Sequence, residues 1–274
     1  MNKIIIILLA VVSLFCNCSK QRNDSPCDCI KKENRKKKPD KKDKVFPTGK
    51  LIITEGRCFP DVVDKYLYPV KYPSEQWYQM TEEERMDACQ LPDDVLKSIS
   101  TLGLIQSFVD LPYDISDMVF YFYNTTTYHQ LTYSLIFKHF NSIEELLTRE
   151  DAAKSLILYL SATKLDCLES FIDIERREFI NRLLGFEYLF TKLEILDMLS
   201  HRDKVNAVGL LLAIYKQWKS LGYRGSSIVP VLAYIMYDDI LPCVDEEVIN
   251  SAVRENYSEE KYSEVVAYAE CFIK

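Results

Sequence analysis

The sequence has few histidines and few glycines for its length. Of 274 residues, only three are histidine and seven are glycine. His129, His139 and His201 do not form the two-histidine helix of a zinc protease, and none accompanies a serine nucleophile elbow. The shortage of glycine argues against a turn-rich β protein. Most hydrolase templates are therefore excluded, and we expect helices to dominate.

Motifs that bind phosphate or zinc are also missing. A Walker loop would need a glycine five residues before the pair Gly49 and Lys50, and that position holds Lys44. Cys27 and Cys29 have the thiol spacing of some zinc sites, but no second cysteine pair or histidine stands nearby. The sequence therefore predicts neither nucleotide binding nor zinc binding at these positions.

Two carboxylates and an imidazole lie close together in the sequence near position 200. Asp197 and His201 are one helical turn apart and Asp203 follows, but this spacing is more typical of solvated side chains than of a metal site. The sequence thus predicts no metal, no cofactor and no catalytic residue. The alternative is an enzyme of unfamiliar type that uses carboxylates such as Asp238 and Asp239.

An apolar run opens the chain. Lys3 precedes the run Ile4–Phe15, which has the order of a secretory signal and is too short to cross a membrane, for which about 20 residues are needed. A cysteine stands where the small cleavage residue would be, and Asn17 before Cys18 is smaller than the phenylalanine before Cys16. We therefore expect residues 1–17 to be cleaved and Cys18, with Cys16 as the alternative, to carry lipid in a bacterial membrane, the outer membrane being the expected one.

The composition of residues 18–46 predicts a disordered basic tether. The run Lys31–Lys44 contains nine Lys or Arg and three Asp or Glu. Such a segment cannot bury a core. It is either a solvated linker, the commoner case, or a site for anionic lipid. No aromatic residue is interleaved for stacking on bases, so nucleic acid is not expected as a partner.

The rest of the chain, residues 47–274, is expected to form an acidic helical domain. Residues 1–44 hold 12 of the 34 Lys and Arg and 5 of the 41 Asp and Glu, so the remainder carries 22 against 36 and a net charge near −14. That charge favours solubility and repels polyanions.

Apolar periods and short polar caps, among them Asp114, Asn124 and Asn141, predict the elements of this domain. An extended segment at Lys50–Thr54 and an irregular Pro- and Tyr-rich stretch at Phe59–Tyr78 come first. Three helices are expected to begin at the Thr81–Glu84 capping box, at Pro92 and at Leu102. Further separate helices are expected over Ile115–Tyr123, Thr125–Phe140, Ile143–Leu147, the region after Thr148, Leu165–Leu183, Phe186–Leu199, Lys204–Leu221, Ile228–Leu241, Glu246–Glu255 and Glu259–Phe272.

Two helix pairs in this pattern are similar to each other. Residues 143–156 align with residues 195–208 at an offset of 52, including a Ser or Thr cap with an acid three residues later, at Thr148 and at Ser200. That unit is typical of helical solenoids, although two copies are fewer than such arrays normally have. The predicted fold class is all-α, either an irregular helical bundle or a HEAT-like α-solenoid, with an extended N-terminal segment.

Seven cysteines remain after the expected lipidation, so not all of them can pair. Cys58 and Cys89 are the candidate disulfide, because it would join the irregular stretch to the first helix. Cys167 and Cys271 lie among apolar residues at helical spacing and are expected to behave as small hydrophobes.

Aromatic residues gather between positions 113 and 133. Tyr113, Tyr121, Tyr123 and Tyr128 are the candidate ligand-facing rings, which would stack on a sugar or anchor a partner if exposed. Helical spacing alone also places several of them on one face, so packing in the core is the more common alternative.

One stretch of the sequence resembles a known family. The residues that carry the resemblance are Glu84, Arg85, Ala88, Cys89, Gln90, Leu91, Pro92, Leu96, Ser100, Thr101, Leu104, Phe140, Asn141, Glu145, Leu146, Leu147, Arg149, Asp151 and Ala152. Over residues 70–160 the chain is similar to an uncharacterised family of secreted bacterial proteins and lipoproteins. The resemblance implies export and a helical fold, and no activity.

Together these features predict a lipid-anchored binding or scaffold protein of the bacterial cell envelope. Its partner would be an unknown protein or glycan. A purely structural envelope protein is the other alternative beside an enzyme.

Overall fold

The computed structural model describes nine stretches of the chain. These are residues 47, 49–55, 57–113, 137, 139–165, 167, 173–222, 228–237 and 259–274, without the side chains of 173–177 and 259–261. Apart from one short hairpin, the described elements are helices, so the all-α prediction is confirmed. Within these stretches no helix is both long enough and apolar enough to span a membrane.

The hairpin is formed by the predicted extended segment. Strand β1 (Leu51–Ile52) pairs antiparallel with β2 (Asp61–Val62), with Leu51 opposite Val62. The free side of β2 does not pair with another strand of the described chain, because the N–H of Val62 donates to the side-chain oxygen of Gln106 at 2.5 Å. The hairpin is thereby attached to a helix.

Four helices follow, and the first begins within the stretch Phe59–Tyr78, which was expected to be irregular, where Ser74 caps it. They are α2 (Glu75–Gln79), α3 (Glu82–Ala88), α4 (Asp93–Ser98) and α5 (Thr101–Val109). The capping box of Thr81 and Glu84 is present at the start of α3. Ser100 caps α5 by accepting from the N–H of Gly103 at 2.9 Å. Every residue of α5 is buried, so α5 is a central element of the core.

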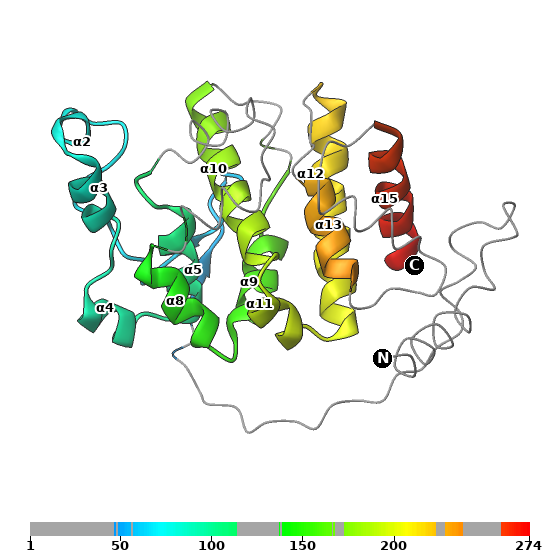
Figure 1. Ribbon diagram of the computed structural model, residues 1–274, viewed down its shortest axis with the longest axis horizontal. Coiled ribbons are helices and arrows are strands. Elements are labelled where there is room, and N and C mark those ends of the chain that lie inside the picture. The colour runs from blue at the N-terminus through cyan, green and yellow to red at the C-terminus, as the bar shows by residue number, and fades with distance from the viewer. Residues whose placement is uncertain are drawn as a thin grey trace, which may run out of the picture.

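Seven further helices complete the described fold. They are α8 (Asn141–Thr148), α9 (Ala152–Ser161), α10 (Asp173–Leu189), α11 (Leu193–Met198), α12 (His201–Ser220), α13 (Ile228–Tyr237) and α15 (Glu259–Phe272). Figure 1 shows α2–α4 at one end of the molecule, α5 and α8–α11 in the middle, and α12, α13 and α15 toward the other end. Helix α5 packs against α8, α9 and α10, α9 packs against α12, and α12, α13 and α15 pack on one another.

The break predicted between two central helices is misplaced, because the chain breaks between Leu189 and Leu193, within the predicted helix Phe186–Leu199. A break was expected between Leu183 and Phe186, but α10 runs through Gly185 to Leu189. A Cβ at Gly185 would lie 3.2 Å from Val109 and 3.3 Å from Phe108, so the glycine lets α10 approach α5 closely. The glycine at this position therefore serves packing and does not end the helix.

The predicted cap at Asn141 is also wrong, whereas the one at Ser200 is correct. The Asn141 side chain accepts from the N–H of Leu91 at 2.9 Å and donates to its carbonyl at 2.8 Å, so it joins two segments and does not cap α8. Thr148 donates to the carbonyl of Glu145 and caps nothing. Ser200 forms a capping box with Asp203, and α12 consequently begins at His201, a residue expected to lie in a helix break.

The residues that carry the family resemblance meet between α3–α5 and α8–α9. Gln90 accepts from the N–H of Asn141 at 3.0 Å, and the Thr101 hydroxyl donates to Asp151 at 2.7 Å. The guanidinium of Arg149, which is 2% exposed, donates to the carbonyl groups of Leu96 and Ile99, both at 2.8 Å. These positions therefore hold helices together.

The disulfide predicted between Cys58 and Cys89 is wrong. Cys58 pairs with Cys167, with 5.5 Å between their Cα atoms, whereas Cys89 is a free buried thiol. The end of α9 returns to the N-terminal segment, where the N–H of Lys164 donates to the carbonyl of Cys58 at 2.7 Å, and this brings Cys167 within reach. Cys271 is disulfide-bonded as well, so neither it nor Cys167 is the unpaired small hydrophobe that the sequence suggested.

Candidate functional site

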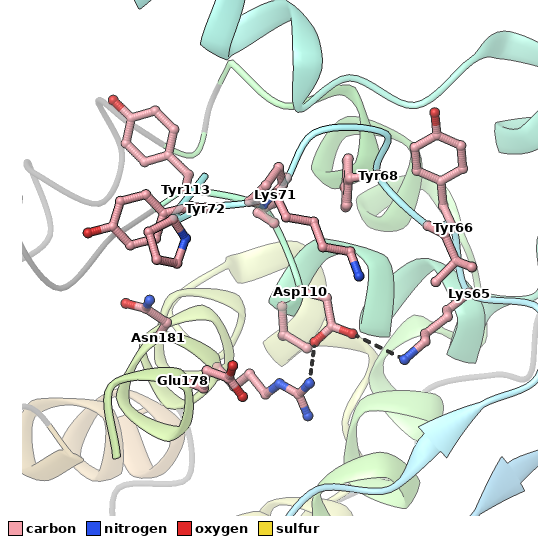
Figure 2. Close-up of a pocket in the computed structure, with 15 residues that line it drawn as sticks. Lys65, Tyr66, Tyr68, Lys71, Tyr72, Asp110, Tyr113, Glu178 and Asn181 are labelled. Atoms are coloured by element: carbon pink, nitrogen blue, oxygen red, sulfur yellow. Dashed lines mark ion pairs between the residues drawn. The ribbon is translucent and has the colours of Figure 1, made fainter. Parts of the chain in front are cut away.

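An open pocket of about 530 Å³ lies where three segments meet, and we call it the tyrosine pocket. Its walls come from residues 65–73 after the hairpin, residues 109–113 at the end of α5, and residues 178–182 of α10. Figure 2 shows these segments around a common hollow. The volume is within the range of small-molecule binding sites.

Four tyrosines line this pocket. Tyr68 and Tyr113 are buried, whereas Tyr66 and Tyr72 are partly exposed. The rings of Tyr66 and Tyr68 meet edge to face, with 5.0 Å between their centroids. Tyr72 meets Trp77 in the same way at 6.3 Å. The pocket therefore presents flat amphipathic surfaces that are already held in place by their neighbours.

Two of these phenols are fixed by hydrogen bonds. The Tyr68 hydroxyl donates to the carbonyl of Ser107 at 3.0 Å, and the Tyr113 hydroxyl donates to the Glu82 carboxylate. Burial raises the pKa of both tyrosines, and the carboxylate of Glu82 raises that of Tyr113 further. Both phenols are therefore neutral at physiological pH.

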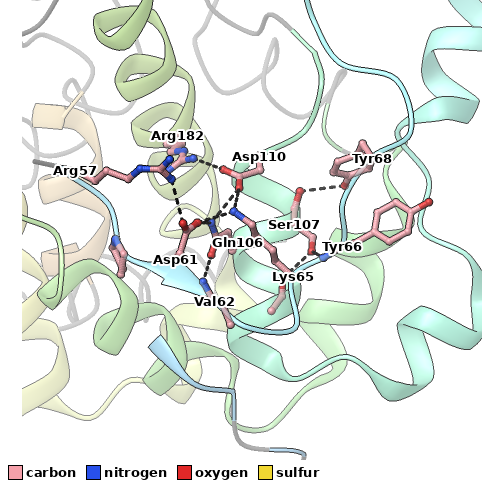
Figure 3. Close-up of polar contacts among 12 residues, drawn as sticks. Arg57, Asp61, Val62, Lys65, Tyr66, Tyr68, Gln106, Ser107, Asp110 and Arg182 are labelled. Carbon is pink, nitrogen blue, oxygen red and sulfur yellow. Dashed lines mark hydrogen bonds and ion pairs between the residues drawn. The ribbon is translucent and has the colours of Figure 1, made fainter. Parts of the chain in front are cut away.

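Asp110 forms part of the pocket wall, and both of its oxygens are engaged (Figure 3). Oδ1 pairs with the Arg182 guanidinium at 2.8 Å, while Oδ2 accepts from Gln106 at 3.0 Å and lies 3.6 Å from the Lys65 ammonium. The Arg182 guanidinium also lies over the ring of Phe59, 5.3 Å from its centroid. Asp110 thus connects α5 to α10.

Asp61 on β2 belongs to the same network. Its carboxylate contacts Arg57 at 3.0 Å and Lys65 at 2.5 Å, and it accepts from Gln106 at 2.8 Å. Burial works to raise the pKa of Asp61, but the hydrogen bonds from Lys65 and Gln106 outweigh it and hold the pKa below its usual value. The carboxylate is therefore ionised at neutral pH. Lys65 and Gln106 contact both carboxylates, so Asp61 and Asp110 together attach the hairpin to α5 and α10.

Two further charged groups of the pocket are exposed. Lys71 has no ion-pair partner within the described stretches, whereas Glu178 interacts electrostatically with Arg182, one helical turn along α10. In Figure 2 the Lys71 side chain reaches from one wall toward the middle of the pocket, and Glu178 comes from α10 on another wall. These two side chains remain available to a ligand.

Of the four tyrosines that the sequence offers as ligand-facing candidates, only Tyr113 lies within the described stretches. Tyr113 lines the pocket. The other predicted site residues lie outside the described stretches: Tyr121, Tyr123, Tyr128, Cys16, Cys18, Lys31–Lys44, Asp238 and Asp239. Residues 65–72 and Glu178 were not singled out from the sequence as site residues. The only local signal for them is the Pro- and Tyr-rich composition of Phe59–Tyr78.

The described residues do not bring together a catalytic or metal centre from the earlier candidates. Asp203 is used in the capping box of α12, and the His201 ring meets that of Phe272 at 5.4 Å. Burial raises the pKa of the Cys89 thiol to about 12, so this cysteine is not a nucleophile. No group of three or more potential metal ligands occurs in the described part of the chain.

Comparison of the chain with protein-family models, with curated proteins and with solved structures gave no match. The resemblance over residues 70–160 therefore stays a prediction, and function has to be argued from the tyrosine pocket.

Proposed function

We propose that this protein is a lipid-anchored binding protein of the bacterial cell envelope that holds its ligand in the tyrosine pocket. The observation that carries the proposal is the pocket itself, an open hollow with several aromatic rings and a few polar groups. Pockets of this composition are the usual sites of ligand binding. Of the partners expected from the sequence, a glycan fits better than a protein, because the rings line a hollow and not a flat face.

Export is supported by the cysteine chemistry. The pair of Cys58 and Cys167 and the bonded Cys271 are typical of proteins that fold in an oxidising compartment. This agrees with the secretory order of residues 1–17. The lipid on Cys18, the outer membrane as its location and the contact of Lys31–Lys44 with anionic lipid are parts of the same proposal.

Binding is favoured over catalysis by the way the acidic groups are used. Asp110 pairs with Arg182 and accepts a hydrogen bond from Gln106, so this carboxylate joins α5 to α10. The buried phenols of Tyr68 and Tyr113 are neutral. Within the described stretches, the pocket therefore offers aromatic surfaces and hydrogen-bonding groups, with Lys71 and Glu178 as its exposed charges.

We also propose that the helices form a solenoid-like array. Three pairs support it, because each of α4–α5, α8–α9 and α11–α12 has a short helix, a break of two or three residues and a second helix. The second helices contact in succession, α5 with α9 and α9 with α12. A crystal structure in which one constant rotation relates the three pairs would support the array, and unrelated rotations would contradict it.

Replacing Cys18 with alanine is expected to abolish lipidation. Radiolabelled palmitate should enter the wild-type protein and be absent from Cys18→Ala, because the thiol at position 18 is the proposed acceptor. The control is Cys16→Ala, which should keep the label. Label that persists in Cys18→Ala and is lost in Cys16→Ala would move the anchor to Cys16.

The pocket is tested by binding of the full chain, purified in detergent, to an array of envelope glycans and peptides. A bound glycan is expected, and Tyr66→Ala should weaken its binding by up to about tenfold, since an aromatic contact contributes about 0.5–1.5 kcal/mol. The matched control is Tyr237→Ala, which removes an exposed ring of α13 far along the chain from the pocket. No binding to any member, or equal loss in both variants, would contradict the proposal.

A further inference from the structure

Lys71 is the cation of the pocket wall that remains without a partner in the described chain. The other two are engaged, because Arg182 and Lys65 lie 2.8 and 3.6 Å from the oxygens of Asp110. Lys71 is exposed, and its ammonium points toward the middle of the hollow in Figure 2. A compact charge in this position is placed to meet an anionic group on a ligand.

The neighbouring charges favour a ligand group with a single negative charge. Glu178, on another wall, is exposed, and its charge is partly offset by Arg182, one helical turn along α10. The single charge of a carboxylate is matched by the Lys71 ammonium, whereas a doubly charged phosphate would keep one negative charge unmatched beside Glu178. The acidic surface beyond the pocket matters less, because charges more than about 8 Å away are screened at physiological ionic strength.

The remaining lining suits a saccharide better than a peptide. Peptide carboxylates are commonly captured by successive backbone N–H groups. In this wall Pro73 and Pro112 have no N–H, and that of Tyr66 donates to the Ser107 hydroxyl at 2.8 Å. Tyr66 and Tyr72 are partly exposed and can contact a sugar ring, and the Glu178 carboxylate can accept hydrogen bonds from its hydroxyl groups.

Resting on the proposed binding function, we propose that the tyrosine pocket selects a carboxylated saccharide. Its carboxylate pairs with the Lys71 ammonium, and its ring lies against the tyrosines. Lys71 is then the residue that sets specificity for an acidic sugar over a neutral one.

The test compares carboxylated oligosaccharides with their own methyl esters, which keep the sugar and lose the charge. Trigalacturonic acid and a sialylated trisaccharide, each beside its methyl ester, are titrated calorimetrically into the full chain in detergent. At least one acid should bind about tenfold more tightly than its ester. Lys71→Gln should reduce that ratio to about one and leave the affinity for the ester unchanged, and Lys71→Arg should keep the preference. Lys97→Gln, at an exposed lysine of α4, is the matched control and should change nothing.

The outcomes separate this inference from the function on which it rests. Acid and ester that bind equally well, or a preference that survives Lys71→Gln, would overturn the role of Lys71 and leave a glycan-binding pocket. Tighter binding of a glucosamine trimer, which is cationic, would reverse the proposed sign of charge. Binding of a tripeptide through its terminal carboxylate and of no saccharide would replace the ligand class. Failure of every acid to bind would overturn the inference, and failure of every neutral glycan as well would remove the binding function too.

Discussion

Replacing Cys58 and Cys167 together with alanine is expected to lower the free energy of unfolding by about 4 kcal/mol. The two residues are 109 positions apart, so their bond closes a long loop in the unfolded chain. Without it the unfolded ensemble gains conformational freedom, while the folded state keeps its other contacts. Urea unfolding of the full chain measures the loss, and the urea slope should also rise, because an unfolded chain without the cross-link exposes more surface.

Cys89 provides the matched control for this variant. It is fully buried and unpaired, so Cys89→Ala removes a sulfur atom without removing a cross-link. We expect a loss of about 1 kcal/mol from the small cavity and an unchanged urea slope. If the double variant loses no more than Cys89→Ala, the bond does not constrain the unfolded chain.

The disulfide partner of Cys58 could not be predicted from the sequence. Pairing Cys58 with Cys89 relied on their proximity along the chain, but the partner was decided by the return of α9 to the N-terminal segment at Lys164. That return is a consequence of packing between distant elements. No spacing or composition near Cys167 indicates it.

Helix starts were predictable because their signals are local. Thr81 with Glu84 and Ser200 with Asp203 form capping boxes within four residues, and both are present. Asn141 has an equally suitable side chain but bonds to the backbone of Leu91 instead, 50 positions away. The two uses look the same in the sequence, because the side chain can bond either way and only the packing of α8 decides.

The tyrosine pocket was predictable only through Tyr113. Its other contributions come from three segments that are far apart in the chain, among them Lys71 and Glu178. Single exposed charges of this kind resemble ordinary surface residues until the fold places them on one hollow. The sequence could therefore predict an aromatic surface, but not its place or the charge that accompanies it.

Replacing Arg149 is the second change with a large expected effect. Its guanidinium donates to the carbonyl groups of Leu96 and Ile99, both at 2.8 Å, and to Glu145 at 3.0 Å. The first two carbonyl groups lie at the end of α4, where the helix has no N–H left to bond them. Because the side chain is only 2% exposed, water does not readily replace it.

Arg149→Met is therefore expected to lower the free energy of unfolding by about 3 kcal/mol, because each buried carbonyl left without a donor costs about 1–3 kcal/mol. Methionine keeps most of the apolar volume of the arginine stem, so this variant isolates the lost hydrogen bonds from lost packing. Arg149→Ala should lose about 1–2 kcal/mol more through the cavity. Arg149→Lys should fall between wild type and Arg149→Met, since one ammonium cannot bond in the two planar directions of a guanidinium.

Arg202→Ala is the control for these measurements, because Arg202 is exposed near the start of α12 and its loss should change stability by less than about 0.5 kcal/mol. The order of the three Arg149 variants in urea unfolding is the informative result. If Arg149→Met were as stable as wild type, the guanidinium would contribute only volume, and the contact between α4 and α8–α9 would be apolar packing. The expected order instead assigns that contact to directed hydrogen bonds, which require arginine at this position.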